Sequence, residues 1–365
     1  MIFYWVLFLI PSFFSFIGQA RVSRNKNGFH SNTLDVLWVL ILLLLTFIIG
    51  LRVEVGGDWF AYIRMFNMVV SLDHSQSFGS FPILAGDPGF LLINWLSHRL
   101  ELGIYGVNFI CGFIFSTGLI LFCRSLPRPF LALAVAVPYM IIVVGMGYTR
   151  QALALGLVMI ALVAISRDKK FLFLFWVLCA VPFHKSAIIM IPIAALATSK
   201  NRVQSIFLTA IIISIAYFNF LADPFEELYR NYILAQDAQS QGALIRVLMN
   251  IMPSLIYLIW PHRFKLQDTE HGVWKIMAYI SIGLLLMLII FPDISTAIDR
   301  VALYMLPIQL VIFSHLPEIF GNTKAISKII TFLILFYYSI VLFIWLNFAI
   351  HAGGWLPYRN LFFDF

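Results

Sequence analysis

Four charged side chains follow one of the most apolar stretches of the chain. The run "LDVLWVLILLLLTFIIG" ends at residue 50, and the next residues, "LRVEVGGDWFAYIRMFN", contain Arg52, Glu54, Asp58 and Arg64. Charge at the mouth of a membrane span is costly and is usually kept for a function. Because guanidinium groups bind carboxylates and phosphates through paired N–H donors, this stretch predicts an anion-binding site at the membrane surface.

Three further cations stand at the ends of apolar runs. They are Arg150 in "GYTRQALA", Lys185 in "FHKSA" and Arg300 in "IDRVALY". For any one of them, a long side chain that reaches the lipid headgroups is an equally good explanation. Four such cations together, with Arg52 included, favour binding of a phosphate or a carboxylate.

Two residues are candidates to take a proton from a substrate. The imidazole of His184 titrates near neutral pH, and its short turn would place it below the membrane surface. A buried neutral histidine bonded to a backbone carbonyl explains the same residue equally well. Asp58 follows Gly56 and Gly57, which predict a turn, so it is either a second candidate base or only the N-cap of a helix.

The sequence lacks the motifs that indicate a bound metal, a nucleotide or a catalytic serine. It contains no GxxxxGK[ST], GxGxxG, HExxH or GxSxG pattern and no acidic metal-binding cluster. Its cysteines, Cys111, Cys123 and Cys179, form no CxxC pair and lie in or beside apolar runs. We therefore expect neither a metal nor a cofactor.

Composition places the chain in a lipid bilayer. Of its 365 residues, 62% are hydrophobic and only 11% are charged, whereas a soluble domain carries roughly a quarter charged residues. The net charge of +7 does not indicate nucleic acid, because basic inner loops of a membrane protein give the same excess. We predict an all-α polytopic protein, with residues 1–365 forming a single integral membrane domain.

Apolar runs predict about twelve membrane-spanning helices, several of them shorter than the ~20 residues that a span usually needs. The runs cover about 1–18, 33–50, 103–123, 129–147, 150–166, 171–183, 186–198, 203–221, 243–260, 273–291, 300–316 and 329–347. Only 29 residues separate Lys170 from Lys200, too few for two complete crossings. The chain should therefore turn back at "PFHKS" before it reaches the outer surface.

The basic residues orient these helices. If residue 1 is outside, fifteen of the 24 Lys and Arg residues lie in inner loops, as the positive-inside rule requires. Both termini then lie outside, together with two long loops at about 51–102 and 222–242. Each loop contains an amphipathic pattern, the first with Trp59, Tyr62, Phe66 and Val69 on one side, the second in "ADPFEELYRNYILAQ".

Four of these motifs, in the same order, resemble those of the EpsG family of Wzy-type polysaccharide polymerases. They are "RVEVGGDWFAY" after the second run, "GYTRQALA", "FHKSAII" and "DRVALY". The match extends over most of the chain, and the closing "WLPYRN" and the middle outer loop are compatible with it.

The resemblance implies a bacterial inner-membrane glycosyltransferase with a GT-C-like fold, acting at the periplasmic face without a metal. Such polymerases join oligosaccharide repeat units carried on undecaprenyl diphosphate, in the synthesis of O antigen, a part of lipopolysaccharide, or of capsule. A separate co-polymerase that regulates chain length is an expected partner.

The resemblance also gives the charged motifs roles. Arg52, Arg150 and Arg300 would hold the lipid diphosphates and Arg300 would act at the reacting bond, while His184 is the first choice for the base and Asp58 the second. The supporting cations are Lys185, Arg230 and Arg64. The residues expected to orient sugar hydroxyls are Tyr62, Tyr148, Gln151, Ser186 and Tyr304.

Three other activities are compatible with a cationic membrane protein of this size. A flippase for the same lipid-linked sugars should show two similar halves, which the sequence does not. An O-antigen ligase uses the same donor and differs in its acceptor, but usually carries a larger outer domain than the loop at 222–242. A membrane O-acyltransferase would want a histidine on the inner side, whereas His184 is predicted to face outward.

Overall fold

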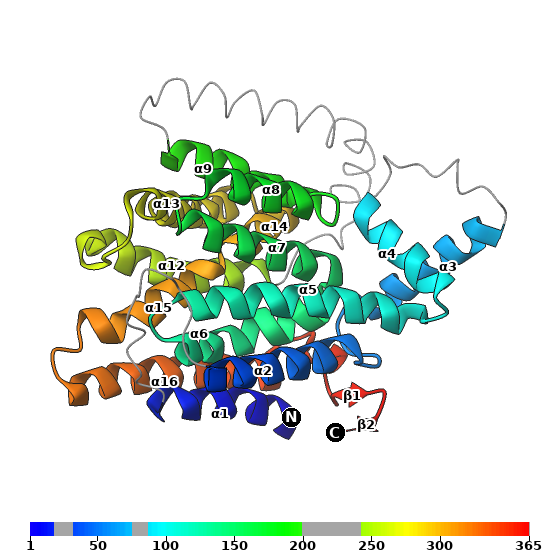
Figure 1. The fold of residues 1–365 in the computed structure, drawn as a ribbon, viewed down its shortest axis with the longest axis horizontal. Helices are drawn as coiled ribbons and strands as arrows, with labels where there is room; N and C mark the ends of the chain where they lie inside the picture. Colours follow the sequence, from blue (N-terminus) through cyan, green and yellow to red (C-terminus); the bar gives the residue numbers. More distant parts are fainter. Residues whose placement is uncertain (18–31, 75–86, 199–241, 365) are drawn as a thin grey trace. The chain divides into compact units, whose positions relative to one another are not determined.

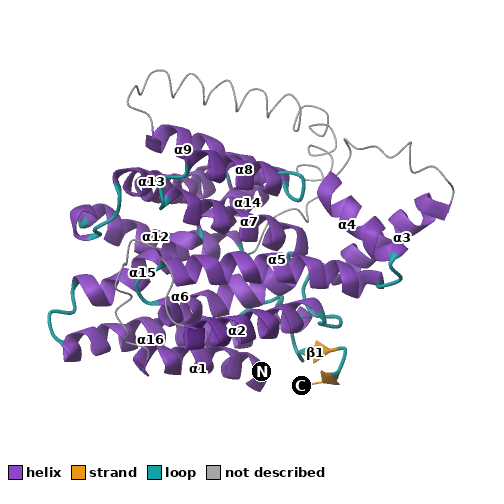
Figure 2. Ribbon diagram, in the orientation of Figure 1, coloured by secondary structure: helices purple, strands orange, loops and turns teal. Residues whose placement is uncertain are grey.

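Almost all of the structure is helical, because a chain in lipid must satisfy its backbone hydrogen bonds within each segment. The computed structural model describes residues 1–17, 32–74, 87–198 and 242–364. Within these ranges, strands are limited to β1 (Arg359–Asn360) and β2 (Phe363–Asp364), which pair antiparallel near the C-terminus (Figure 2). The predicted all-α class is confirmed.

The chain divides into two compact units. Unit 1 comprises Met1–Ile160, Pro182–His184 and Phe313–Phe365, and unit 2 comprises Ala161–Val181 and Lys185–Ile312. The division cuts through two helices: α7 (Thr149–Ile165) begins in unit 1 and ends in unit 2, and α15 (Pro307–Ile319) begins in unit 2 and ends in unit 1. It also separates His184 from Lys185, which are neighbours in the sequence.

Unit 1 is built on a group of apolar helices. Its helix α1 contacts α6 and α16, and α2 contacts α5 (Figure 1). The elements are α1 (Ile2–Ile17), α2 (Asn32–Gly50), α3 (Trp59–His74), α4 (Pro88–Arg99), α5 (Gly103–Ser125), α6 (Pro129–Ala136), the π-helix η2 (Val137–Gly145), the start of α7, the end of α15 (Pro307–Ile319), α16 (Lys324–Phe348) and η7 (Ala352–Gly354).

Unit 2 is organised around α13, which contacts α9, α12 and α14. The elements are the end of α7, α8 (Lys170–Ala180), η3 (Lys185–Ile189), α9 (Met190–Thr198), α12 (Ala243–Ile259), η5 (Pro261–Arg263), α13 (Asp268–Ile290), η6 (Pro292–Ile294), α14 (Ser295–Met305) and the start of α15.

Four helical segments among the described residues are long and apolar enough to cross a membrane: Gly103–Ser125, Asp268–Ile290, Pro292–Ile319 and Lys324–Phe348. Seven shorter apolar helices accompany them. Most of their bounds follow the predicted apolar runs to within five residues, but the segment Pro292–Ile319 begins eight residues before the run predicted at 300–316. The run at 203–221 and the helix predicted at 222–242 lie outside the described residues.

The turn predicted at "PFHKS" is confirmed, and the helix before it is short. Helix α8 has 11 residues, which gives a length of about 16 Å, against the ~30 Å thickness of the hydrocarbon core. The chain then turns through Pro182–His184 and continues as the short 3-10 helix η3.

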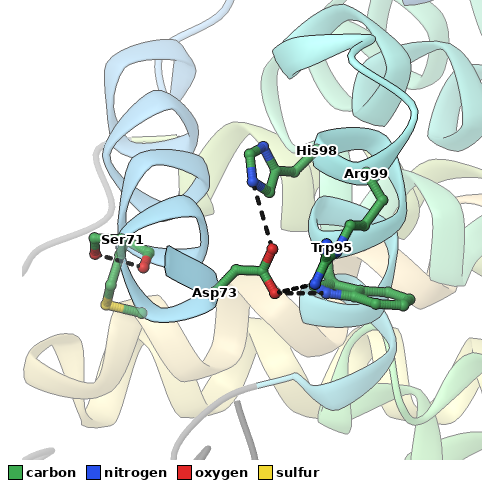
Figure 3. A network of polar contacts seen from close by, with 6 residues as sticks. Ser71, Asp73, Trp95, His98 and Arg99 are labelled. Carbon is green, nitrogen blue, oxygen red and sulfur yellow. Dashed lines mark hydrogen bonds and ion pairs between the residues drawn. The ribbon is translucent and has the colours of Figure 1, made fainter. Parts of the chain in front are cut away.

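The loop predicted at about 51–102 contains the predicted amphipathic helix. It is α3, with Trp59, Tyr62 and Val69 buried. Helix α3 is tied to α4 by Asp73, whose carboxylate accepts from the Nε1 of Trp95 at 3.2 Å and from Arg99 at 2.9 Å (Figure 3).

A proline separates α14 from α15 and leaves a carbonyl to be satisfied. Pro307 has no N–H, and the N–H of Leu306 bonds Leu303 instead of continuing the α-helical ladder. The freed carbonyl of Ala302 accepts from the side chain of Asn250 at 3.0 Å, and Asn250 in turn accepts from Gln309 at 2.7 Å. This buried network fixes α12 against α14.

Candidate functional site

The loop that follows α2 is held from within by Arg52. This side chain is only 1% exposed. Its Nε donates to the carbonyl of Val55 at 3.0 Å, and its Nη2 donates to the hydroxyl of Thr149 at 2.8 Å. Its Nη1 donates to the carbonyl of Ile49, one of the carbonyls that the end of α2 leaves without a helical partner.

Arg52 therefore has a structural role in addition to its electrostatic one. Burial lowers the pKa of Arg52 to about 10, so the guanidinium still carries its charge at neutral pH. It also lies 5.7 Å from the ring centre of Trp59. It supplies a positive charge to the site while its donors hold the loop and the start of α7.

The C-terminal segment covers this loop. The N–H of Val53 bonds the carbonyl of Arg359 at 3.0 Å, and the N–H of Leu361 bonds the carbonyl of Leu51 at 2.8 Å. The side chains of Arg359 and Glu54 pair at 2.8 Å. The closing "WLPYRN" and the "RVEVGGD" motif, about 300 residues apart in the sequence, therefore form one structure.

Trp355 packs against two of the sequence motifs, "RVEVGGDWFAY" and "GYTRQALA". Its Nε1 donates to the carbonyl of Ile142, in η2, at 2.9 Å, and its own carbonyl accepts from Tyr4 at 2.6 Å. A Cβ on Gly147 would lie 2.4 Å from Cζ2 of the Trp355 indole, and one on Gly57 would lie 3.4 Å from the same ring. The glycines of "GGD" and "GYTR" thus leave the space that this indole occupies.

Replacement of Trp355 by Phe should weaken the site without unfolding unit 1. The variant loses the buried bond to Ile142 and leaves that carbonyl without the indole, which should cost about 1–3 kcal/mol. Thermal unfolding in detergent would measure it. Trp5→Phe is the matched control, since Trp5 is half-buried on α1 and contacts Phe8 by its ring; equal losses of stability in both variants would contradict this role of Trp355.

The second cation of the site is Arg150, next to the Thr149 that binds Arg52. Its Nη1 pairs with Oδ2 of Asp87 at 2.8 Å, with side chains 31% and 11% exposed respectively. The guanidinium carbon lies 5.9 Å from the ring centres of both Tyr62 and Phe90. The Nε of Arg150 is buried and has no hydrogen-bond partner among the described residues, and the 31% of the side chain that is exposed leaves the guanidinium open to a ligand.

Asp87 is the residue that sequence reasoning missed. It precedes Pro88 and is the N-cap of α4, a position where an aspartate is ordinary. Its side chain, however, makes no capping bond and binds Arg150 instead. The "DP" dipeptide indicates a helix start in the sequence; nothing in the spacing indicates the partner 63 residues away.

Three further predicted residues belong to the elements around this ion pair: Tyr62, Asp58 and His184. Tyr62 is buried, and burial together with the Asp58 carboxylate raises the pKa of Tyr62 to about 12; its hydroxyl therefore stays protonated and can donate. His184 is also buried. The turn that contains it is docked on the start of α4, because the N–H of Gly89 bonds the carbonyl of Pro182 at 2.8 Å.

The raised pKa of Tyr62 makes a testable contribution to stability. Above pH 10 an unfolded chain loses the phenol proton, whereas the folded chain keeps it to about pH 12; stability should therefore fall as the pH rises through this window. Tyr62→Phe removes that contribution, so its unfolding temperature should fall less between pH 9 and pH 11 than that of the wild type. The other tyrosines are common to both proteins, and parallel pH curves would contradict the prediction.

Four more of the predicted residues, Lys185, Ser186, Arg300 and Tyr304, belong to unit 2. Lys185 and Ser186 lie on η3, which contacts α14, and α14 carries Arg300 and Tyr304. Asp299 pairs with Arg246 of α12 at 2.5 Å, and both side chains are buried. This pair fixes α14 about its axis and gives Asp299 a structural role.

The predicted set thus falls into two groups, one in each unit. In unit 1, Arg52 bonds Thr149 beside Arg150, and Tyr148 and Gln151 flank Arg150 in the chain. Arg64 lies on an exposed face of α3, unlike the buried Tyr62, and Arg230 lies outside the described residues. Across the ranges that the structure describes, no group of three or more His, Cys, Asp or Glu side chains is arranged to hold a metal.

Comparison with known proteins gives one match. The model of the EpsG family matches residues 35–360, a range that contains both groups of predicted residues. No curated protein and no solved structure matches the chain.

Proposed function

Because the chain belongs to the EpsG family, we propose that it is a membrane glycosyltransferase that polymerises lipid-linked oligosaccharides. The substrate in this proposal is a repeat unit carried on undecaprenyl diphosphate, for O antigen or capsule. The observation that carries it is Arg150, a partly exposed arginine with a buried Nε without a partner, held over two aromatic rings by Asp87.

The chemistry needs positive charge where the leaving group departs. In the proposed step a hydroxyl of the acceptor unit attacks the anomeric carbon of the growing chain. A new C–O bond forms, and the bond from that carbon to the diphosphate oxygen breaks with its electron pair on the diphosphate. A preorganised guanidinium stabilises this developing charge without reorganisation of water, and Arg150 takes that part in unit 1.

Arg52 would contribute differently from Arg150. All three of its guanidinium nitrogens already donate to the protein, so we propose that it positions the loop and Thr149 and adds its charge to the site. Arg300 and Lys185 of unit 2 are proposed to bind the diphosphate of a lipid-linked substrate, with Ser186 and Tyr304 contacting sugar hydroxyls. Arg64, exposed on α3, would meet a substrate at the surface of unit 1.

The acceptor hydroxyl must lose a proton in this step, and His184 and Asp58 both remain candidates for the base. His184 is supported by its docked turn at the start of α4, where Asp87 holds Arg150. Asp58 is supported by its electrostatic interaction with Tyr62. A neutral imidazole can accept a proton at neutral pH and would suit the task.

The location proposed for this activity is the bacterial inner membrane. About twelve spans in a GT-C-like arrangement, with both termini and the site on the periplasmic face, would place the charged loop after α2 where lipid-linked units arrive. The distribution of basic residues supports this orientation. Charge stabilisation is assigned to arginines, with no metal, and a co-polymerase would act on chain length.

The test is a polymerisation assay with purified protein. Undecaprenyl-diphosphate-linked repeat units from the host of the protein are incubated with it, and the products are resolved on a gel. A ladder spaced by one repeat unit is expected. His184→Ala and Asp58→Asn are compared with His351→Ala, an exposed histidine outside the site.

Each outcome of this assay decides a point. A ladder lost in His184→Ala and kept in Asp58→Asn assigns the base to His184, and the reverse result assigns it to Asp58. No ladder from folded wild-type protein with authentic substrate would reject the polymerase, and transport of the same lipid into liposomes would then be measured. Loss of activity in His351→Ala would show that the assay responds to histidine substitution in general.

A further inference from the structure

Unit 1 contains an apolar groove of about 200 Å³ on the side of α1 and α2. All its lining residues are apolar; among them are Leu7 and Pro11 of α1, Leu40 and Leu44 of α2, Leu133 of α6 and Ile141 of η2. Leu40 and Leu44 are 56% and 46% exposed, so the groove opens to the outside of the unit. Such a lining excludes a sugar or a phosphate, whose polar groups would be left without hydrogen bonds.

The size of the groove restricts its occupant. An apolar cavity of about 150 Å³ binds benzene, so there is room here for a branched hydrocarbon segment. One turn of an α-helix about 10 Å across fills roughly 400 Å³, which is too large. A whole turn of a helix therefore does not fit within the groove, whereas part of a hydrocarbon chain does.

The helices that line the groove also lead to the arginine site. On α1, Tyr4 lies one turn before Leu7 and bonds the carbonyl of Trp355. On α2, Leu44 lies about 9 Å along the axis from Gly50, two residues before Arg52. On η2, Ile141 precedes Ile142, whose carbonyl accepts from Trp355, and the chain reaches Arg150 nine residues after Ile141.

We propose that this groove binds the polyprenyl tail of the lipid-linked substrate whose diphosphate lies at Arg150. The proposal rests on the function proposed above, since it takes the diphosphate lipid from there and adds the site of its hydrocarbon chain. Burial of the tail between α1 and α2 holds the lipid in one orientation. The diphosphate is then presented to the guanidinium rather than left free to diffuse in the bilayer.

Photolabelling tests the groove directly. The full-length protein is placed in nanodiscs of phosphatidylethanolamine and phosphatidylglycerol, with a polyprenyl diphosphate that carries a diazirine in the isoprene units next to the diphosphate. Adducts are expected on α1 and α2 peptides that line the groove. Excess unlabelled polyprenyl diphosphate should remove them, and the same excess of phosphatidylglycerol should not.

Substitutions on one helix provide the matched comparison. Leu40→Trp and Leu44→Trp fill the groove from its exposed rim and should lower labelling about tenfold, the size expected from overpacking. Leu43→Trp makes the same change at a residue of α2 that is 55% exposed and does not line the groove, so its labelling should stay within about twofold of wild type. All three proteins are first checked for an unchanged thermal unfolding temperature.

The results separate this proposal from the proposed function. Labelling outside the groove, an equal loss in Leu43→Trp, or equal competition by phosphatidylglycerol overturns the tail site, even if the wild type still makes a polysaccharide ladder. Groove labelling that responds to Leu40→Trp in a protein that makes no ladder supports the tail site and rejects the polymerase.

Discussion

Arg150→Ala should lower the rate of polymerisation by a factor of about 100 to 1,000, the range found when one donor to a developing negative charge is removed. The mutated side chain is the one with both exposure and an unused donor beside the ion pair. Arg150→Lys should recover little of the loss, because an ammonium group lacks the planar donors and the contact with the Tyr62 and Phe90 rings. The measurement is the rate of ladder formation at saturating substrate.

Arg359→Ala is the matched control for this change. Its Nη1 also pairs with a carboxylate at 2.8 Å, that of Glu54, but both side chains are close to half exposed, so the pair should contribute at most about 1 kcal/mol.

A second control concerns Asp87, which would be left without its arginine in Arg150→Ala. The double variant Asp87→Asn/Arg150→Ala removes that unpaired charge, and recovery of activity in it would contradict a direct role of Arg150.

The limits of sequence analysis are clearest at Arg52. Its place after an apolar run identifies it as an unusual charge, and the structure does bring it beside the start of α7. What the sequence cannot provide is how its donors are distributed. Val55, Ile49 and Thr149 take them, and two of these acceptors are backbone carbonyls that any residue could supply. The role of Arg52 as a positioning group therefore follows only from the folded loop.

Contacts between residues that are far apart in the chain could not be predicted from the sequence, for a related reason. The apolar runs predicted the helices well, because helix bounds depend on local hydropathy and on prolines and glycines. The pairing of Arg150 with Asp87 and the docking of Trp355 depend instead on which helices pack together. A tryptophan near the C-terminus is equally typical of a membrane interface, and only the carbonyl of Ile142 gives it a specific place.

Gly56→Ala should be the most damaging single-methyl change in the segment between α2 and α3. Gly56 has φ of 110°, which side chains rarely adopt, and a Cβ there would lie 2.3 Å from the carbonyl oxygen of Met146. Backbone strain of this kind costs about 1–3 kcal/mol, and the clash with a backbone atom adds to it. Because the N–H of Gly56 also bonds the carbonyl of Gly354, the shift should disturb the loop that carries Arg52 and Asp58. Both the unfolding temperature and the ladder rate should fall.

Gly103→Ala is the control for Gly56→Ala, because it places an alanine at positive φ without a steric clash. Gly103 has φ of 59°, and a Cβ there would meet nothing within 4 Å, so the variant should lose only about 1 kcal/mol and retain its activity. Gly56→Ala should lower the unfolding temperature at least twice as much as Gly103→Ala does. Equal shifts would mean that the chain around Met146 moves aside at little cost, and that the two arginines do not depend on the close contact between the loop after α2 and the end of η2.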